Sequence, residues 1–166
     1  MLTHFDIRLA GPDDVPCVAA MADGFRRLEG REHPTEAELA ERISPMMDDP
    51  DTDFFVAFDP NPHGGEGQCA GFLQQRYRLT IWTDGGDAYI ETVFVAEHAR
   101  RRGLGKQLVE AAMARARERG YELITLDTNE RNVRAIALYE QLGFVNTGGP
   151  DSPIGGDRQF WFERGL

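Results

Sequence analysis

The chain has 166 residues, a length typical of one compact domain, and its 18 basic and 28 acidic residues give a net charge of -10. Its content of 41% hydrophobic and 28% charged residues is that of a folded globular protein and excludes a disordered one. The acidic balance disfavours nucleic acid as a partner, because binding a phosphate backbone needs a basic face. We therefore expect a single domain over residues 1–166, with a cationic substrate.

The remaining composition disfavours membranes, disulfides and metals. No apolar run approaches the ~20 residues that span a bilayer, and residues 1–14 lack the apolar core of a secretory signal. We expect a cytoplasmic protein with no membrane partner. Cys17 and Cys69 are isolated and lack CxxC spacing, which predicts two reduced thiols rather than a disulfide or a zinc site. The histidines are scattered singly, so no metal is expected.

The first third of the chain is predicted to form a strand and two helices. Residues 6–10 alternate weakly and indicate a short strand. Apolar residues at spacings of three and four then predict a helix within residues 15–30. Residues 35–38 have the spacing of a capping box and begin a second helix, which we expect Pro45 to break.

The middle of the chain is predicted to be β-structure. Residues 53–58 and 69–78 are typical of an antiparallel hairpin with a long tip. Residues 88–95 are almost continuously β-forming, which suits a central strand covered on both faces, although Glu91 interrupts the run. Alternation places Glu91 on the same face of this strand as Tyr89.

The last part of the chain alternates helices and strands. We expect a helix over 104–119, a strand over 122–128, a helix over 130–142, and final strands over 144–147 and 158–163 around the loop 148–157. The order of elements is therefore β α α β β β α β α β β, which indicates an α+β fold. Only the part after Gly103 has the strand-helix-strand unit that implies parallel pairing.

The segment between the central strand and the third helix, Arg100–Lys106, concentrates four positive side chains in an acidic protein. A strand that leads through a glycine-bearing loop into a helix presents unpaired N–H groups and a positive dipole end to an anion. Gly103 and Gly105 allow positive φ and a close approach of the backbone. Other phosphate loops fit worse, since a Walker loop would need Ser or Thr at Gln107 and the dinucleotide fingerprint Gly or Ala at Leu108. From charge and glycine alone, a solvated turn has equal weight.

Two motifs together resolve this choice. The pattern V-x-x-x-x-R-x-x-G-x-G runs from Val95 to Gly105, and N-x-x-A-x-x-L-Y-x-x-L-G-F runs from Asn132 to Phe144. Over nearly its whole length the chain resembles the GNAT superfamily of N-acetyltransferases, enzymes that use acetyl-CoA. The resemblance implies an α+β, GNAT-type mixed central β-sheet flanked by helices, with a splayed pair of parallel central strands.

The resemblance also implies how acetyl-CoA binds, without a metal. Loop amides would hold the CoA diphosphate, and the matching residues are Arg100, Arg101, Arg102, Gly103, Leu104, Gly105 and Lys106. The backbone of Val93, Phe94 and Val95 would hydrogen-bond the pantetheine. Asn132 matches a position that contacts the cofactor, although an Asn in a first turn is also explained by helix capping.

Two residues are candidates for catalysis. Tyr139 matches the general acid that protonates the departing thiolate, and a phenol with a pKa of ~10 suits that task at neutral pH. The alternative is a core tyrosine on the apolar face of its helix. Glu91 is the candidate base that removes the proton of the amine. It also fits a carboxylate that binds the substrate cation without proton transfer, or a charge satisfied within the fold.

The expected reaction is transfer of an acetyl group to a primary amine of a small cationic molecule. Residues expected near the acceptor are Tyr77, Trp82 and Tyr89, with Asp23, Glu29, Asp127 and Glu130 adding negative potential. For each aromatic residue the alternative is core packing. Alternative functions are N-terminal or lysine acetylation of a protein, and a non-catalytic acyl-CoA-binding regulator. The apolar strand 158–163 permits a homodimer through paired C-terminal strands.

Overall fold

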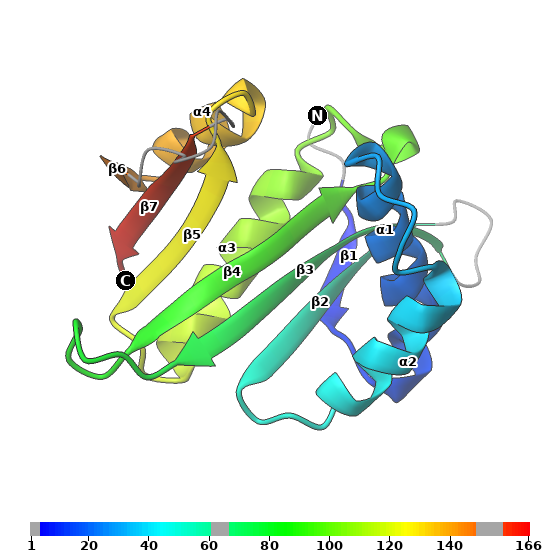
Figure 1. Cartoon of the computed structure of the whole chain (residues 1–166), viewed down its shortest axis with the longest axis horizontal. Coiled ribbons are helices and arrows are strands. Elements are labelled where there is room, and N and C mark those ends of the chain that lie inside the picture. The colour runs from blue at the N-terminus through cyan, green and yellow to red at the C-terminus, as the bar shows by residue number, and fades with distance from the viewer. Residues whose placement is uncertain (1–3, 61–66, 149–157) are drawn as a thin grey trace. The chain divides into compact units, whose positions relative to one another are not determined.

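The computed structural model describes residues 4–60, 67–148 and 158–166 (Figure 1). Its order of strands and helices is the predicted one. The elements are β1 (Asp6–Leu9), α1 (Val15–Leu28), α2 (Glu36–Met46), β2 (Thr52–Asp59), β3 (Gln68–Arg78), β4 (Asp87–Val95), α3 (Leu104–Glu118), β5 (Leu123–Asn129), α4 (Val133–Gln141), β6 (Val145–Gly148) and β7 (Gln159–Gly165). Most of the expected loop 148–157 and the tip of the β2–β3 hairpin lie outside the described residues.

The strands form a mixed sheet, as predicted. They are hydrogen-bonded in the order β1-β2-β3-β4-β5-β7-β6. β4 and β5 are parallel, with residues 88–90 opposite residues 124–126. The pairs β1–β2, β5–β7 and β6–β7 are antiparallel. The single strand-helix-strand unit recognised in the sequence therefore accounts for the parallel pair β4–β5.

The chain forms two compact units, Met1–Gln75 with Thr92–Ala112, and Arg76–Glu91 with Met113–Leu166. In the first unit, α1 and α2 pack on one side of the strands. Its core contains Val18, Ala19, Ile43, Phe54, Val56, Phe72 and Phe94. Gly71 of β3 faces the start of α3, where a Cβ would lie 2.7 Å from the Phe94 carbonyl oxygen and 3.2 Å from Leu104. Glycine at this position lets α3 begin close to the strands.

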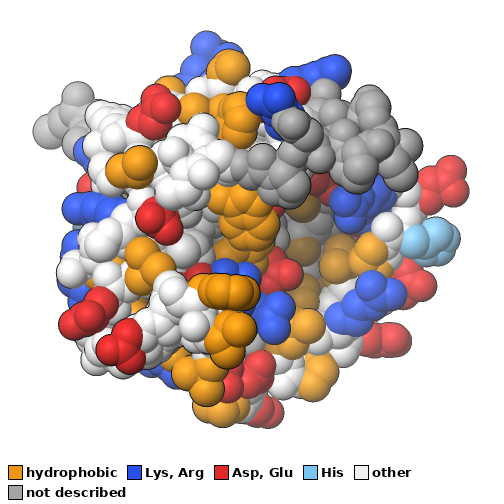
Figure 2. All heavy atoms as spheres, turned by 60° about the vertical axis from the view of Figure 1, so that its left-hand side comes forward, with side chains coloured by type: hydrophobic (Ala, Val, Ile, Leu, Met, Phe, Trp, Pro, Cys, Tyr) orange, Lys and Arg blue, Asp and Glu red, His pale blue; other side chains and the backbone are white. Residues whose placement is uncertain are grey.

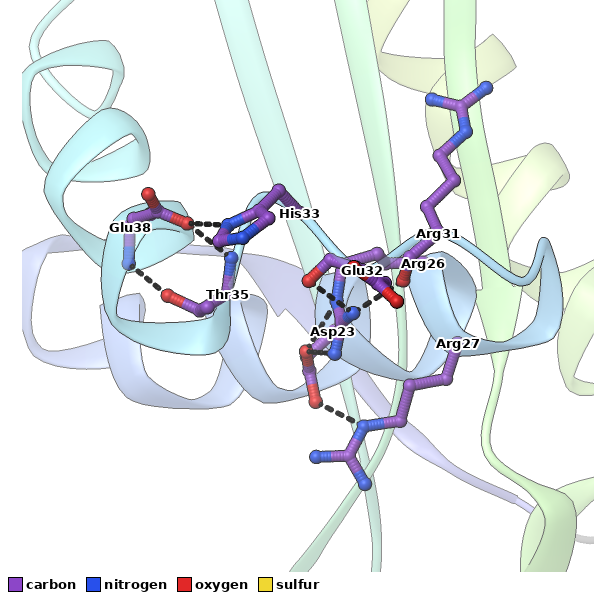
Figure 3. Close-up of polar contacts among 8 residues, drawn as sticks. All are labelled: Asp23, Arg26, Arg27, Arg31, Glu32, His33, Thr35 and Glu38. Atoms are coloured by element: carbon purple, nitrogen blue, oxygen red, sulfur yellow. Dashed lines mark hydrogen bonds and ion pairs between the residues drawn. The ribbon is translucent and has the colours of Figure 1, made fainter.

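Arg26 fixes the connection between α1 and α2 (Figure 3). Its guanidinium donates to the Asp23 carboxylate at 2.8 Å and to the carbonyl oxygens of Arg31 and Glu32 at 2.5 and 2.8 Å. Asp23 is buried and also accepts from Arg27 at 2.8 Å. Two guanidiniums thus neutralise this buried carboxylate, so the negative potential expected from Asp23 is not available to a substrate.

The predicted capping box of α2 is confirmed (Figure 3). Thr35 Oγ1 accepts from the Glu38 amide at 3.3 Å, and Glu38 Oε2 accepts from the Thr35 amide at 2.6 Å. The Thr35 amide, with help from His33, lowers the pKa of Glu38 to about 2. The expected break at Pro45 is wrong, because α2 continues to Met46. Pro45 lies in the last turn, where its missing N–H costs only a terminal hydrogen bond.

Cys17 of α1 and Cys69 of β3 form a disulfide, with their Cα atoms 5.9 Å apart. The prediction of two reduced thiols is therefore wrong. The two residues are 52 positions apart, and neither their spacing nor their neighbours in the sequence show that α1 lies across β3.

The second unit is built around β5, which pairs with β4 on one side and β7 on the other. Helix α4 packs through Tyr139, whose ring lies 5.8 Å from that of Phe144 and 6.0 Å from that of Phe162. β7 has β5 and β6 as neighbours. A homodimer, which stays a prediction, would extend this sheet through β6 rather than through β7.

Among the helices of the described residues, none is long and apolar enough to cross a membrane. The same residues contain no group of three or more His, Cys, Asp or Glu side chains that could hold a metal ion.

Candidate active site

The loop between β4 and α3 has the backbone geometry of an anion site. Arg101 has a φ of 60° and Gly103 a φ of 84°, so two residues of this short loop are left-handed. Such a value is uncommon for a residue with a side chain. The Gln107 amide donates to the Gly103 carbonyl at 3.2 Å. The amides of residues 104–106 lie in the first turn of the helix, where backbone N–H groups have no partner within the helix. Loop amides and the positive end of α3 therefore suit a diphosphate.

Arg102 connects the loop to other residues of the first unit. Its guanidinium makes two hydrogen bonds to the Asp59 carboxylate, of 2.5 and 2.9 Å, and lies 4.8 Å from the centre of the Phe5 ring. This pairing raises the pKa of Arg102 and lowers the pKa of Asp59. Arg102 therefore joins the loop to the end of β2.

The other three basic residues of the loop differ in their partners. Arg100 Nε donates to the Val95 carbonyl at 3.1 Å. Lys106 lies 3.8 Å from Glu110, one turn further along α3. Within the described parts of the chain, Arg101 makes no ion pair. Of the four cations predicted to meet the diphosphate, Arg101 is thus the one that no described residue engages.

The last residues of β4, 93–95, lie beyond the stretch paired with β5, which ends at Ile90. Phe94 is buried and packs edge-on against Phe25, with the ring centroids 6.4 Å apart. The side chains of Val93 and Val95 are half-buried. Alternation places them on the face opposite Phe94. This arrangement is compatible with the backbone contacts expected of residues 93–95.

Tyr139, the predicted general acid, is 8% exposed in the second unit. Burial raises the pKa of Tyr139 to about 12, and the negative charge of Asp127 acts in the same direction. The phenol is therefore protonated at neutral pH and can donate a proton but not accept one. Its contacts with two phenylalanines show that it also packs in the core.

Asn132 begins helix α4. Its Oδ1 accepts from the Ala135 amide at 3.4 Å, and its Nδ2 donates to Thr128 Oγ1 at 3.4 Å. Both polar ends of the side chain are therefore used where the helix starts, which explains an Asn at this position by capping. Its predicted contact with the cofactor stays a prediction.

Glu91, the predicted base, lies on the surface of the second unit. Its side chain is 38% exposed and pairs with Arg76 at 3.3 Å. The Glu91 carboxylate is thus already paired within the fold. This environment favours the alternative in which Glu91 is satisfied within the fold.

A second polar cluster lies beside Glu91 and was not recognised in the sequence. The Tyr89 hydroxyl donates to Asp127 Oδ1. Arg78 lies 4.0 Å from the centre of the Tyr89 ring and makes hydrogen bonds of 3.0 and 2.6 Å to Asp87. Burial is the main cause that raises the pKa of Tyr89, and its bond to Asp127 adds to the shift. Alternation along β4 and β5, combined with parallel pairing, is the sequence signal for this cluster.

The other residues expected near the acceptor are placed differently. Tyr77 stacks on Tyr121 with centroids 4.9 Å apart and lies beneath Arg119 at 3.8 Å, so core packing is its role. Trp82 is 86% exposed. Glu29 is paired with Arg31 at 3.0 Å. Acidic and basic side chains are interspersed over the face drawn in Figure 2, and no broad acidic surface covers it.

A hollow of about 660 Å³ in the first unit is separate from these residues. It is lined by His4, Phe5, Asp6, Ile7, Pro60, Gln107, Glu110 and Ala111. None of them is a predicted site residue.

Curated relatives are acetyltransferases by name. The mycothiol acetyltransferase of Salinispora tropica is 35% identical over 140 residues, which cover 81% of this chain and 42% of that protein. The human N-acetyltransferase 8 is 41% identical over 56 residues, which cover 34% of this chain and 25% of that protein. The matches thus span less than half the length of these relatives.

Solved structures show the same fold. An acetyltransferase from Thermus thermophilus covers 100% of both chains with a TM-score of 0.74 and 22% identity. Arabidopsis thaliana NAA60 in complex with acetyl-CoA has a TM-score of 0.72 and 19% identity, and the match covers 98% of this chain and 99% of that one. The acetyltransferase (GNAT) family model matches residues 19–144, which is most of the chain. The protein therefore belongs to the GNAT acetyltransferase family.

Proposed function

We propose that this protein is an acetyl-CoA-dependent N-acetyltransferase that acts on a primary amine of a small cationic molecule. The observation that carries the proposal is the loop before α3, where Arg101 and Gly103 have φ values of 60° and 84°. Left-handed residues and helix-start amides fit a diphosphate. Membership of the GNAT family supports acetyl-CoA as its source. When bound, acetyl-CoA supplies an activated acetyl thioester.

In this proposal the chain binds the diphosphate through residues 100–106 and the pantetheine through the backbone of residues 93–95. Arg101 contributes a side-chain charge, whereas Arg102 keeps the loop in place through Asp59. Asn132 begins α4 and supports the cofactor from its position at the helix start. No metal takes part in this proposal.

Tyr139 is proposed as the general acid of a direct attack by the amine. Its pKa of about 12 keeps the hydroxyl protonated at neutral pH, so the proton is still present when the thiolate leaves. A thiolate leaving group is the species to which this hydroxyl would give its proton. Glu91, the base expected from the sequence, is not given the proton-transfer step in this proposal. Its pairing with Arg76 favours a supporting role.

A small amine is favoured over a protein substrate by the named activity of a relative. The mycothiol acetyltransferase of Salinispora tropica, by its name, acts on a small molecule. Acidic and basic side chains are interspersed over the described part of the face drawn in Figure 2. A compact ammonium needs only one open carboxylate, whereas a peptide needs an extended surface.

The test is acetylation of a panel by the purified protein and acetyl-CoA, with the acetylated product identified by mass spectrometry. The panel contains polyamines, aminoglycosides, amino acids, and peptides with a free N-terminus or lysine. We expect saturable acetylation of small amines. Acetylation of peptides alone would replace this proposal with protein acetylation. Acetyl-CoA binding without any product would replace it with the non-catalytic regulator.

A further inference from the structure

The polar cluster of the second unit contains one carboxylate more than it contains guanidiniums. Arg76 pairs with Glu91 at 3.3 Å, and Arg78 pairs with Asp87 at 2.6 Å. Asp127 is the third carboxylate of this cluster, and among the described residues no cation pairs with it. The cluster therefore carries one uncompensated negative charge, on Asp127.

The Asp127 carboxylate is held in one orientation with one oxygen open. Its Oδ1 accepts from the Tyr89 hydroxyl, whereas its Oδ2 accepts no hydrogen bond from any described residue. The side chain is partly buried. Leaving a partly buried carboxylate without a cation is costly, so the arrangement suits a ligand that brings a positive charge.

Aromatic side chains flank this carboxylate on two neighbouring strands. Tyr89 of β4 contacts it directly. On the other side, Trp161 of β7 lies opposite Asp127 in the antiparallel register and is 38% exposed. Residues that are directly opposite in such a pair share a face, with Cβ atoms ~5 Å apart. A carboxylate between two aromatic rings is well suited to a small organic ammonium.

Asp127 also acts on the residue proposed as the general acid through its charge. Its charge contributes to the raised pKa of Tyr139, so the two side chains interact electrostatically within the second unit. Glu91 has no comparable link, since its shown partner is Arg76.

We propose that Asp127, oriented by Tyr89 and flanked by Trp161, binds the ammonium of the acceptor and takes its proton. The proposal rests on the proposed acetyl transfer and names its acceptor site. One ammonium N–H bond breaks, the proton moves to Asp127 Oδ2, and the electron pair stays on nitrogen, which becomes the nucleophile. Asp127 later releases this proton to solvent. The nitrogen then forms the C–N bond to the acetyl carbon, the C–S bond breaks, and Tyr139 gives its proton to sulfur. The second proton leaves nitrogen for solvent, and Tyr139 takes a proton back from solvent.

Several other charged or titratable groups near Asp127 could also affect the pH dependence of the reaction. They are Arg76 and Arg78 from β3, Asp87 and Glu91 from β4, Glu163 from β7 and Tyr139 from α4. Glu163 lies opposite Thr125 and is exposed. Variants at Asp127 and Glu91 separate the two carboxylates that compete for the role of base.

The test titrates the CoA-saturated protein with spermidine by calorimetry in three forms: parent, Asp127→Asn and Glu91→Gln. Asn keeps an oxygen that can accept the Tyr89 hydrogen bond, so the variant should fold. We expect Asp127→Asn to weaken spermidine binding about tenfold or more, and Glu91→Gln to change it less than about threefold. Acetyl-CoA affinity should stay within about twofold of the parent in both variants.

A kinetic comparison completes the test with the best amine of the panel. The low-pH limb of kcat/KM should be lost in Asp127→Asn and kept in Glu91→Gln. Equal spermidine binding by parent and Asp127→Asn, or no amine binding by the parent, would overturn the proposed site. Acetylation at parental rates by Asp127→Asn would overturn it and leave acetyl transfer standing. Asp127-dependent spermidine binding without acetylation of any amine would instead overturn the proposed function.

Discussion

Arg102 in the loop before α3 and Asp59 at the end of β2 are joined by two hydrogen bonds, of 2.5 and 2.9 Å. The pairing shows that consecutive arginines of this loop have different roles, which the sequence of three arginines does not reveal. Arg102 keeps the loop in place, and Arg101 is open to a ligand.

The paired residues should therefore behave as a unit. We predict that Arg102→Ala and Asp59→Ala weaken acetyl-CoA binding by similar factors, and that the double variant is no worse than either single one. Arg101→Ala should weaken binding without lowering the melting temperature. Calorimetry and thermal unfolding measure both effects. If Arg102 instead contacts the diphosphate directly, Arg102→Ala will lose affinity and Asp59→Ala will not.

The connection between α1 and α2 provides a second prediction. Arg26 is largely buried and binds Asp23 and two carbonyl oxygens, whereas Arg27 binds the same carboxylate but is 71% exposed. We predict that Arg26→Ala lowers the free energy of unfolding by about 1–3 kcal/mol, because buried polar groups lose their partners. Arg27→Ala is the matched control and should cost less than about 1 kcal/mol. Equal losses in urea unfolding would contradict this account.

The sequence predicted the fold well, because its signals are local. Three kinds of signal lie within one helical turn or one strand. They are the spacing of apolar residues by three and four, the capping box of Thr35 and Glu38, and the glycines that end helices. The loop before α3 is also a local pattern; its left-handed residues, Arg101 and Gly103, are observed, whereas its binding of an anion stays a prediction. The error at Pro45 shows the limit of a local rule, since the effect of proline depends on how near the helix end lies.

The predictions that failed concern pairs of residues far apart in the chain. The disulfide joins α1 to β3, and the Tyr89–Asp127 bond joins β4 to β5. The sequence placed Glu91 on the correct strand, but its pairing with Arg76 depends on the register between β3 and β4. Such register is set by tertiary packing, which single positions do not encode.

The disulfide leads to a third prediction. Replacing both Cys17 and Cys69 with Ser should lower the free energy of unfolding by about 2–4 kcal/mol relative to the oxidised parent. The reduced parent should match the double variant. Alkylation and mass spectrometry of freshly isolated protein would report the state of the pair. Fully alkylated thiols would agree with the cytoplasmic location predicted from the sequence, since reducing compartments keep such thiols free.

Tyr139 should make the protein sensitive to alkaline pH. The pKa of Tyr139 is raised to about 12 in the folded state, compared with 10.0 for an ordinary tyrosine. Its stabilising contribution is therefore complete below pH 10 and is lost as the pH rises from 10 to about 12. Over this pH range the free energy of unfolding should fall by about 2–3 kcal/mol less in Tyr139→Phe than in the parent. Equal losses would show that the phenol ionises as readily in the folded chain as in the unfolded one.

The central claim is that this chain transfers acetyl groups with Tyr139 as the acid. The most direct measurement follows thiol release from acetyl-CoA by parent and Tyr139→Phe with the same amine, together with acetyl-CoA affinity by calorimetry. We predict saturable release by the parent and turnover at least about 100-fold slower in Tyr139→Phe, with acetyl-CoA affinity within about twofold. Equal rates in the two proteins would contradict the role of Tyr139. Absence of release by the parent with every amine would contradict the transfer itself.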